Sequence, residues 1–253
     1  MSISCQQEIT INVVGGVDAY WTFEELGTVN RVDKVHAIAL VPTLVLDGGS
    51  GFLTNAAGIQ GQGALYFLGG AGTGSQVPQM ETAIFPGTAF LALQAGKGFS
   101  FAGWFFVFGD ANQAQGNSWD LNFIDSLFNQ LGDIQISLSA NQVQLRITDS
   151  LGNTDSIFTA LPLNAWMFFH MWFDPADSKV HLSLNNAASL NGTVALTFTP
   201  VGAGDTGQIF NFNSQYHCIQ DEWAIKVSGI FTPAQQAYLY NGGLGRTWPL
   251  TLP

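Results

Sequence analysis

Positively charged residues are scarce in this chain: Lys and Arg number 7 among 253 residues, against 18 Asp and Glu. Charged residues make up 10% of the sequence, whereas an average soluble domain has about 25%. No basic cluster is present to neutralise phosphates, which argues against nucleic-acid binding. The shortage of charge predicts a surface that packs extensively against other proteins, because a dilute cytosolic enzyme usually carries more charge for solubility.

Export and membrane signals are also missing. The N-terminal segment MSISCQQEITINVV has neither the basic region nor the continuous apolar run of a signal peptide. The sequence contains no uninterrupted run of about 18 apolar residues, so it predicts no membrane span. We therefore expect a protein made in the cytosol and released by lysis, as a phage virion component would be. Cys5 and Cys218 form no metal-binding motif, and we expect two isolated thiols or one optional disulfide.

Catalytic and cofactor motifs are absent from the sequence. The 29 glycines form no phosphate-binding loop, and the 4 histidines show no spacing typical of zinc or of a Ser/His/Asp set. Adjacent acids occur at Glu24-Glu25 and Asp221-Glu222, and neighbours on a strand point to opposite faces of the sheet. The sequence therefore predicts a protein that is not an enzyme and requires no cofactor.

Aromatic and alternating apolar residues are abundant. Hydrophobic residues reach 47%, with 20 Phe and 7 Trp, which rules out general disorder. Apolar residues alternate along residues 134–138 and 143–147, which predicts a hairpin turning at 140–141. Residues 165–174 and 179–186 predict a second hairpin, and the apolar run Phe99 to Phe108 predicts a central strand covered on both faces.

These patterns predict an all-β protein, built as a two-sheet antiparallel β-sandwich with one short C-terminal helix. The helix is expected from Pro233 to about Asn241, with Thr232 as its N-cap and glycines ending it. Residues 1–18 are interpreted as an N-terminal arm with a strand, and residues 19–253 as a single domain.

Several segments in order resemble the laminin-G-like, concanavalin-A-like jelly-roll family of phage and bacterial surface proteins. The segments AYWTFEE and GQGALYF resemble its opening strands, and FSFAGWFF resembles its core strand. LNAWMFFHMWFDPADSKVHLSLNN resembles the hairpin that follows, and QDEWAIKVSGIFTPAQQAYLYNGG resembles the closing strand and helix. The resemblance spans most of the chain from about Ala19 to Pro249 and implies a jelly-roll sandwich.

The resemblance also implies candidate sites. Relatives of this fold hold calcium with carboxylates and carbonyls, and the implied ligands here are Glu24, Asp33, Asp221 and Glu222. The alternative is that Arg31 pairs with Asp33 or Asp221 and fixes the N-terminal turn. Glycosidases of the fold carry an E-x-D-x-E strand with two carboxylates roughly 5 Å apart, which this sequence lacks.

Sugar binding would need exposed aromatic residues beside polar loop residues. Trp119 and Tyr216 lie in such segments and are the carbohydrate-binding candidates, although a lone loop Trp also serves as packing or as an interface anchor. The remaining tryptophans assessed are expected in the core: Trp21, Trp104, Trp166, Trp172 and Trp223.

The sequence leaves three functions open. The first is a non-catalytic virion decoration protein with a lectin-like fold on a phage capsid or tail, which contacts other virion proteins, like subunits in a homo-oligomer and host glycans. The second is a secreted or surface carbohydrate-binding or adhesion module, located outside the cell. The third is a glycan-cleaving enzyme of the same fold.

Overall fold

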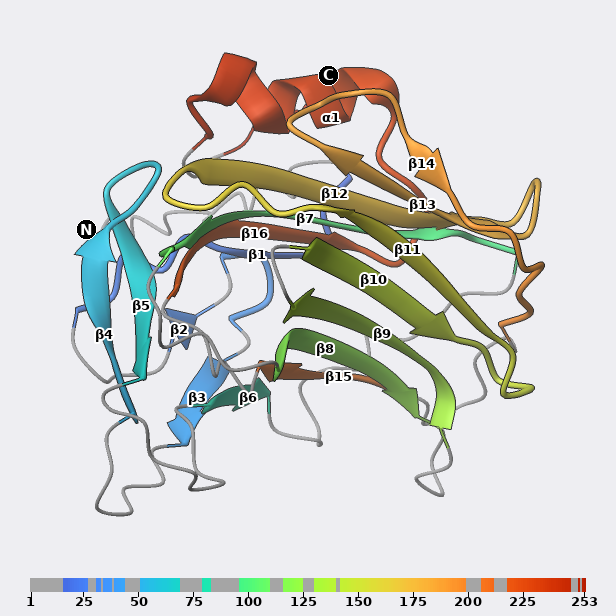
Figure 1. Ribbon diagram of the computed structural model, residues 1–253, viewed down its shortest axis with the longest axis horizontal. Coiled ribbons are helices and arrows are strands. Elements are labelled where there is room, and N and C mark those ends of the chain that lie inside the picture. Colours follow the sequence, from blue (N-terminus) through green and yellow to red (C-terminus); the bar gives the residue numbers. More distant parts are fainter. Residues whose placement is uncertain are drawn as a thin grey trace, which may run out of the picture.

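The computed structural model describes residues 16–26, 31–32, 34–37, 39–43, 51–68, 79–82, 96–109, 116–124, 130–139, 142–198, 206–211, 218–246, 250 and 252–253. Two antiparallel sheets face each other, and a short helix covers the outer side of one of them (Figure 1). The predicted two-sheet β-sandwich with one short C-terminal helix is confirmed. No helix among these described residues is long and apolar enough to cross a membrane.

Sheet I has the strand order β14-β13-β12-β7-β16-β5-β4, with β1 also paired to β16. Its strands are β1 (Ala19–Trp21), β4 (Gly51–Ala57), β5 (Gln62–Leu68), β7 (Phe99–Val107), β12 (Trp166–Asp174), β13 (Lys179–Leu184), β14 (Leu190–Asn191) and β16 (Cys218–Lys226). Sheet II has the order β11-β10-β9-β8-β15-β6-β3-β2. Its strands are β2 (Arg31–Val32), β3 (Ala39–Thr43), β6 (Gln79–Thr82), β8 (Gly116–Ile124), β9 (Gln130–Ser139), β10 (Gln142–Thr148), β11 (Thr154–Ala160) and β15 (Thr206–Asn211).

Both predicted hairpins are confirmed. Strands β9 and β10 pair with Ser139 opposite Gln142, and β12 pairs with β13 with Asp174 opposite Lys179. Along β10 the burial alternates strictly, with Val143 buried and its neighbour Gln142 exposed. This alternation arises because successive side chains on a strand point to opposite faces of the sheet.

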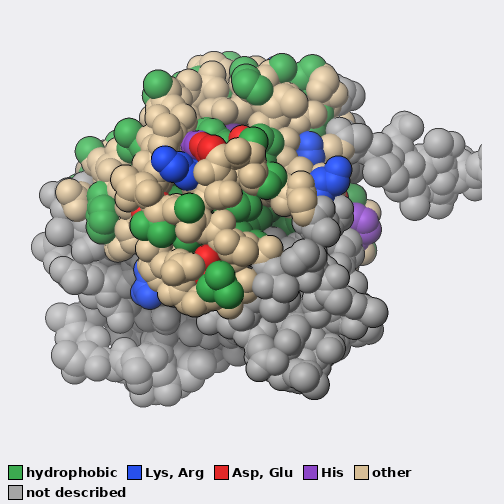
Figure 2. All heavy atoms as spheres, turned by 90° about the vertical axis from the view of Figure 1, so that its right-hand side faces the viewer, with side chains coloured by type: hydrophobic (Ala, Val, Ile, Leu, Met, Phe, Trp, Pro, Cys, Tyr) green, Lys and Arg blue, Asp and Glu red, His purple; other side chains and the backbone are tan. Residues whose placement is uncertain are grey.

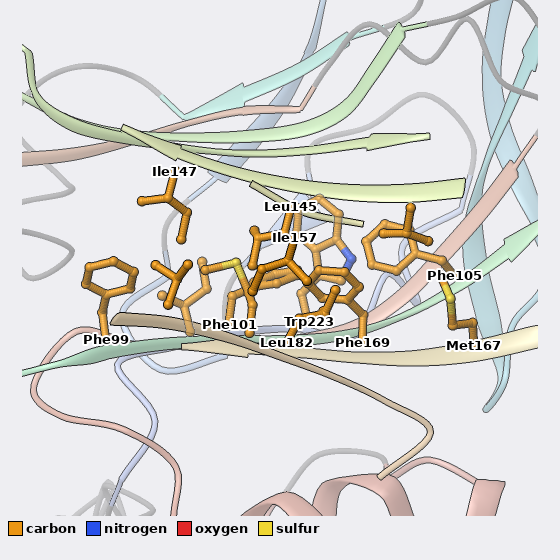
Figure 3. Close-up of a cluster of buried hydrophobic side chains, with 14 of the residues drawn as sticks. Phe99, Phe101, Phe105, Leu145, Ile147, Ile157, Met167, Phe169, Leu182 and Trp223 are labelled. Carbon is orange, nitrogen blue, oxygen red and sulfur yellow. The ribbon is translucent and has the colours of Figure 1, made fainter. Parts of the chain in front are cut away.

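The main core fills the space between the two sheets (Figure 3). Sheet I contributes aromatic rings such as Phe101 and Trp223, and sheet II contributes aliphatic side chains such as Leu145 and Ile147. Strand β7 lies between β12 and β16 and is buried on both faces, as its apolar sequence predicts.

A second cluster lies on the outer face of sheet I, beneath helix α1 (Pro233–Tyr240). The ring of Trp104 stacks on Tyr240 at 5.9 Å between centroids, and Leu239 of the helix is buried in the same cluster. Thr232 caps the helix by accepting a hydrogen bond from the Gln235 N–H at 3.2 Å. The predicted N-cap is therefore confirmed, and Asn241 ends the helix in a left-handed conformation.

Residues 185–198, here called the crossing segment, connect the edges of the two sheets. Near sheet I, the Leu196 N–H donates to the Ser178 carbonyl at 2.8 Å. Near sheet II, the Val194 N–H donates to Asp155 at 3.0 Å, and the Thr197 N–H donates to Asp149 at 2.8 Å. The segment thus bridges the sheets at an open side of the sandwich.

Asp149 is the anchor of the crossing segment. Its Oδ1 accepts the N–H groups of Leu151 and Asn153 at 2.9 and 2.8 Å, and its Oδ2 accepts the Asn153 amide at 3.0 Å and Thr197 N–H. Burial alone would raise the pKa of this carboxyl, but the four donors outweigh it and lower the pKa.

Replacing Asp149 with alanine is expected to lower the free energy of unfolding by about 2–3 kcal/mol, because several N–H donors lose a charged acceptor. Asp149→Asn keeps one acceptor oxygen and should lose less. Urea denaturation of the three proteins, together with limited proteolysis of residues 185–198, measures the effect. Equal stability of the wild type and Asp149→Ala would show that the segment is held by other contacts.

Some predicted features fall outside the described residues. These are the N-terminal arm except its last residues, the thiol of Cys5, and the candidate residues Asp33 and Tyr216. Cys218 is buried in β16.

Candidate functional site

The acid pair Asp221 and Glu222 lies on one face of sheet I, which corrects the prediction of opposite faces. The register of β16 against β7 shifts between Asp221 and Ala224, and Glu222 adopts a left-handed φ of 49°. Such a bulge adds a residue and changes the direction of the side chains around it. Asp221 lies opposite Trp104, and Glu222 contacts Tyr20; both partners belong to the cluster on the outer face.

Asp221 is fully buried, and backbone donors surround its carboxyl group. Oδ1 accepts the Glu222 N–H at 2.9 Å, and Oδ2 accepts the Gln60 N–H at 3.3 Å. Burial raises the pKa of Asp221 to about 8, although hydrogen bonds from the backbone oppose this rise. Asp221 is therefore mainly protonated at neutral pH.

Glu222 belongs to a chain of hydrogen bonds. The Tyr20 hydroxyl contacts the Glu222 carboxyl group and lies 2.7 Å from the Arg246 carbonyl oxygen. A single hydroxyl proton cannot be donated to both acceptors. A protonated Glu222 resolves this, because it donates to the tyrosine oxygen while the hydroxyl donates to Arg246. Burial, followed by the nearby Asp221, raises the pKa of Glu222 to about 9, in agreement with this arrangement.

The predicted calcium site is described only in part, because Asp33 lies outside the described residues, and calcium binding here stays a prediction. Calcium takes six to eight oxygen ligands, but no three His, Cys, Asp or Glu side chains in the described ranges are grouped closely enough to hold a metal ion. Glu24 is close enough to influence the pKa of Asp221 and Glu222. However, its carboxylate accepts the Gln62 N–H at 3.3 Å, across a turn where Gly61 has a φ of 57°.

Three of the four predicted ligands, Glu24, Asp221 and Glu222, are thus neighbours, but their carboxyl groups already form hydrogen bonds with N–H and hydroxyl groups. The acids connect β1, the turn at residues 58–62 and the C-terminal segment at Arg246. Asp221 is 0% exposed and Glu222 4% exposed, so a polysaccharide cannot reach this pair. The arrangement suits a structural role, in which the two protonated acids hold neighbouring segments together by hydrogen bonds.

Of the two carbohydrate-binding candidates from the sequence, one lies in the described part of the chain. Trp119 lies in strand β8 with its Cα opposite Ile136, so the predicted polar loop at this position is wrong. Tyr216 is outside the described residues. Of the expected core tryptophans, Trp21, Trp104 and Trp223 are buried, while Trp166 and Trp172 are only partly buried.

A different surface carries the chemistry of a binding site. The outward-facing side chains of β10 and β11 form a surface here called the polar face: Gln142, Gln144, Arg146, Thr148, Thr154, Ser156, Phe158 and Ala160. Phe158 is 55% exposed and lies opposite Gln144 in the strand register. The Gln144 amide donates to the Ser156 hydroxyl at 3.3 Å.

The backbone register aligns further residues with this face across sheet II. The row that contains Ser156 and Arg146 continues through Gln135 of β9 and Asp120 of β8 to Phe210 of β15. Strands lie about 4.8 Å apart, so five strands span roughly 19 Å. A surface of this width suits an extended ligand better than a single small molecule.

The sequence analysis did not identify Phe158, although a signal was present. Residues 154–160 alternate, and Ile157 is buried on the inner side. An aromatic residue next to the inward-facing Ile157 must point outward if the strand is regular. Phe158 is thus an aromatic candidate on a strand, whereas the sequence-based candidates Trp119 and Tyr216 were expected in loops.

No protein-family model and no curated protein matches this chain. Among solved structures, the chain is similar to the binding domain of Paraclostridial Mosquitocidal Protein 1, with 12% identity, a TM-score of 0.61, and coverage of 91% of this chain and 53% of that one. The binding domain of botulinum neurotoxin serotype G gives 11% identity, a TM-score of 0.59, and coverage of 88% and 50%. This chain therefore spans about half the length of the toxin domains that it matches.

A third similar structure is domain 4 of AbnA, an extracellular arabinanase from Geobacillus stearothermophilus, in complex with arabinotriose. The identity is 14% and the TM-score 0.57, with coverage of 91% of this chain and 98% of that domain. At these identities the similarity shows the fold alone. The fold of this chain is a β-sandwich similar to those of the two toxin binding domains and of the arabinanase domain.

Proposed function

We propose that the chain is a non-catalytic glycan-binding module whose contact surface is the polar face of sheet II. The observation that carries this proposal is the exposed ring of Phe158 among amide, hydroxyl and guanidinium groups. A ring that is 55% exposed offers an apolar platform for the apolar side of a sugar. The neighbouring Gln144 and Ser156 offer donors and acceptors for sugar hydroxyl groups.

The similar structures support a binding role. One of them is a domain in complex with arabinotriose, and others are named as binding or receptor-binding domains. The buried state of Asp221 and Glu222 supports the non-catalytic part of the proposal, because the hydrolysis of a glycosidic bond needs two acids beside the bond. These acids lie in sheet I, whereas the polar face lies on sheet II.

The setting that we propose is a phage virion, where the module decorates a capsid or tail and contacts other virion proteins and like subunits. The low charge supports this setting, because dense assemblies tolerate surfaces with few charges. Figure 2 shows one end of the molecule, where most described side chains are uncharged. Purified source particles should contain the chain at stoichiometric copy number, and its absence would instead favour a secreted or surface adhesion module.

Replacing Phe158 with alanine is expected to weaken glycan binding at least about tenfold, because the central apolar contact is lost. Binding is measured on a glycan array and then by titration calorimetry with the best ligand. Leu151→Ala is the matched control, because Leu151 is 71% exposed but lies in the turn after β10. Unchanged binding by Phe158→Ala would place the glycan site elsewhere.

A further inference from the structure

Arg146 stands out on the polar face because it is the only charged residue among the described side chains there. It is exposed in the middle of β10, between Ser156 on one neighbouring strand and Gln135 on the other. No salt bridge joins it to any residue whose side chain the structure describes. The whole chain has only 7 Lys and Arg, so a cation at this position is uncommon in this sequence.

The two acids nearest to Arg146 on β10, β11 and their connecting turn are engaged elsewhere. Asp149 accepts four hydrogen bonds from the turn and the crossing segment. Asp155 points to the inner side of β11, where it is 5% exposed and accepts the Val194 N–H at 3.0 Å. Neither of these two carboxylates is therefore oriented to neutralise the guanidinium group, and Arg146 is exposed to solvent.

We propose that the polar face binds a saccharide that carries a carboxylate, such as a uronic or sialic acid, and that Arg146 pairs with this carboxylate while Phe158 contacts the sugar ring. This inference rests on the proposed glycan-binding function and adds the class of ligand. A guanidinium group fits a carboxylate with two parallel hydrogen bonds, which neither Gln144 nor Ser156 can provide.

The acidic net charge of the chain, −11, does not oppose this pairing at short range. Salt screens exposed charges beyond about 8–10 Å at physiological ionic strength. The closest acids in the register of sheet II are Asp133, opposite Thr148, and Asp120, opposite Gln135. Two acidic residues at these register positions disfavour a densely charged chain, so the inferred ligand has isolated carboxylates and is not a highly sulfated polysaccharide.

The test uses a glycan array that contains acidic glycans, each with its neutral counterpart: sialylated and desialylated glycans, and uronate oligomers with and without reduction of the carboxyl groups. The wild type is expected to bind the acidic member of a pair about tenfold more tightly. Arg146→Gln should lose this preference and bind both members of a pair alike. Arg146→Lys should keep part of the preference, and higher salt should reduce it.

Lys97→Gln is the matched control, because it removes the same charge from an exposed residue that precedes β7 in the sequence. It should keep the preference for acidic glycans. Equal binding of acidic and neutral members by the wild type, or a preference for sulfated chains, would overturn the inference and leave the proposed function intact. Binding to no glycan on the array would overturn both.

Discussion

Replacing Trp223 with alanine is expected to lower the free energy of unfolding by about 3–5 kcal/mol, the range for removal of a large aromatic side chain from a core. Trp223 is fully buried between the two sheets. Its ring centroid lies 5.1 Å from that of Phe23 and 5.6 Å from that of Phe101, both in edge-to-face geometry. The truncation removes these contacts and leaves a cavity that the surrounding strands cannot fill.

Urea denaturation at neutral pH measures this loss as a lower midpoint with an unchanged slope. Trp223→Phe keeps an aromatic ring and should lose less stability. Phe158→Ala is the control for an exposed aromatic residue and should change the stability by less than about 0.5 kcal/mol. Similar midpoints for Trp223→Ala and Phe158→Ala would contradict the assignment of Trp223 to the core between the sheets.

The sequence predicted those parts of the fold that depend on local patterns. The two hairpins followed from alternation and turn residues, and the C-terminal helix followed from Thr232-Pro233 and the residues after Tyr240. Each of these signals arises from neighbours in the chain. The order of strands within the sheets depends on contacts between distant segments, such as β16 between β5 and β7, which a single sequence does not display.

The prediction for the acid pair failed for a related reason. Alternation places Asp221 and Glu222 on opposite faces only if β16 is regular, and its pairing with β7 contains a bulge. The left-handed conformation of Glu222 is rare for a residue other than glycine and leaves no mark in the sequence. The candidate site on the polar face was overlooked because polar residues on a strand also occur on any solvated face. The alternation of residues 154–160 indicates the outward direction of Phe158, and its 55% exposure distinguishes it from the polar residues around it.

The bulge buries both acids on one face of the sheet, and the stability of the folded protein therefore depends on pH. Asp221 and Glu222 are buried beside each other, and Tyr20 links Glu222 to the C-terminal segment. Two ionised carboxylates at this site would be poorly solvated and would repel each other. The folded protein therefore holds protons that the unfolded chain releases at neutral pH.

Glu222→Gln is accordingly expected to stabilise the protein at high pH and to have little effect near pH 4. The folded state raises the pKa of Glu222 from 4.5 to about 9 and that of Asp221 from 3.8 to about 8. Between these limits the folded state binds more protons than the unfolded state, so stability falls as pH rises. The slope reaches about 1.4 kcal/mol per pH unit for each group. A glutamine amide donates to the Tyr20 oxygen as the protonated acid does, but it does not ionise.

Urea midpoints measured from pH 4 to pH 9.5 test this expectation. His170, whose pKa burial lowers to about 3, adds the same opposing slope below about pH 6.5 to both proteins. Relative to the wild type, Glu222→Gln should therefore gain about 1.4 kcal/mol per pH unit between about pH 4.5 and 9. Tyr20→Phe separates the hydrogen bond from the charge: it removes the partner of the protonated Glu222 and should destabilise the protein already at pH 4, where Glu222→Gln does not. Parallel profiles of the wild type and Glu222→Gln would show that Glu222 is ionised in the folded state. Glu222 would then donate no hydrogen bond to the Tyr20 oxygen.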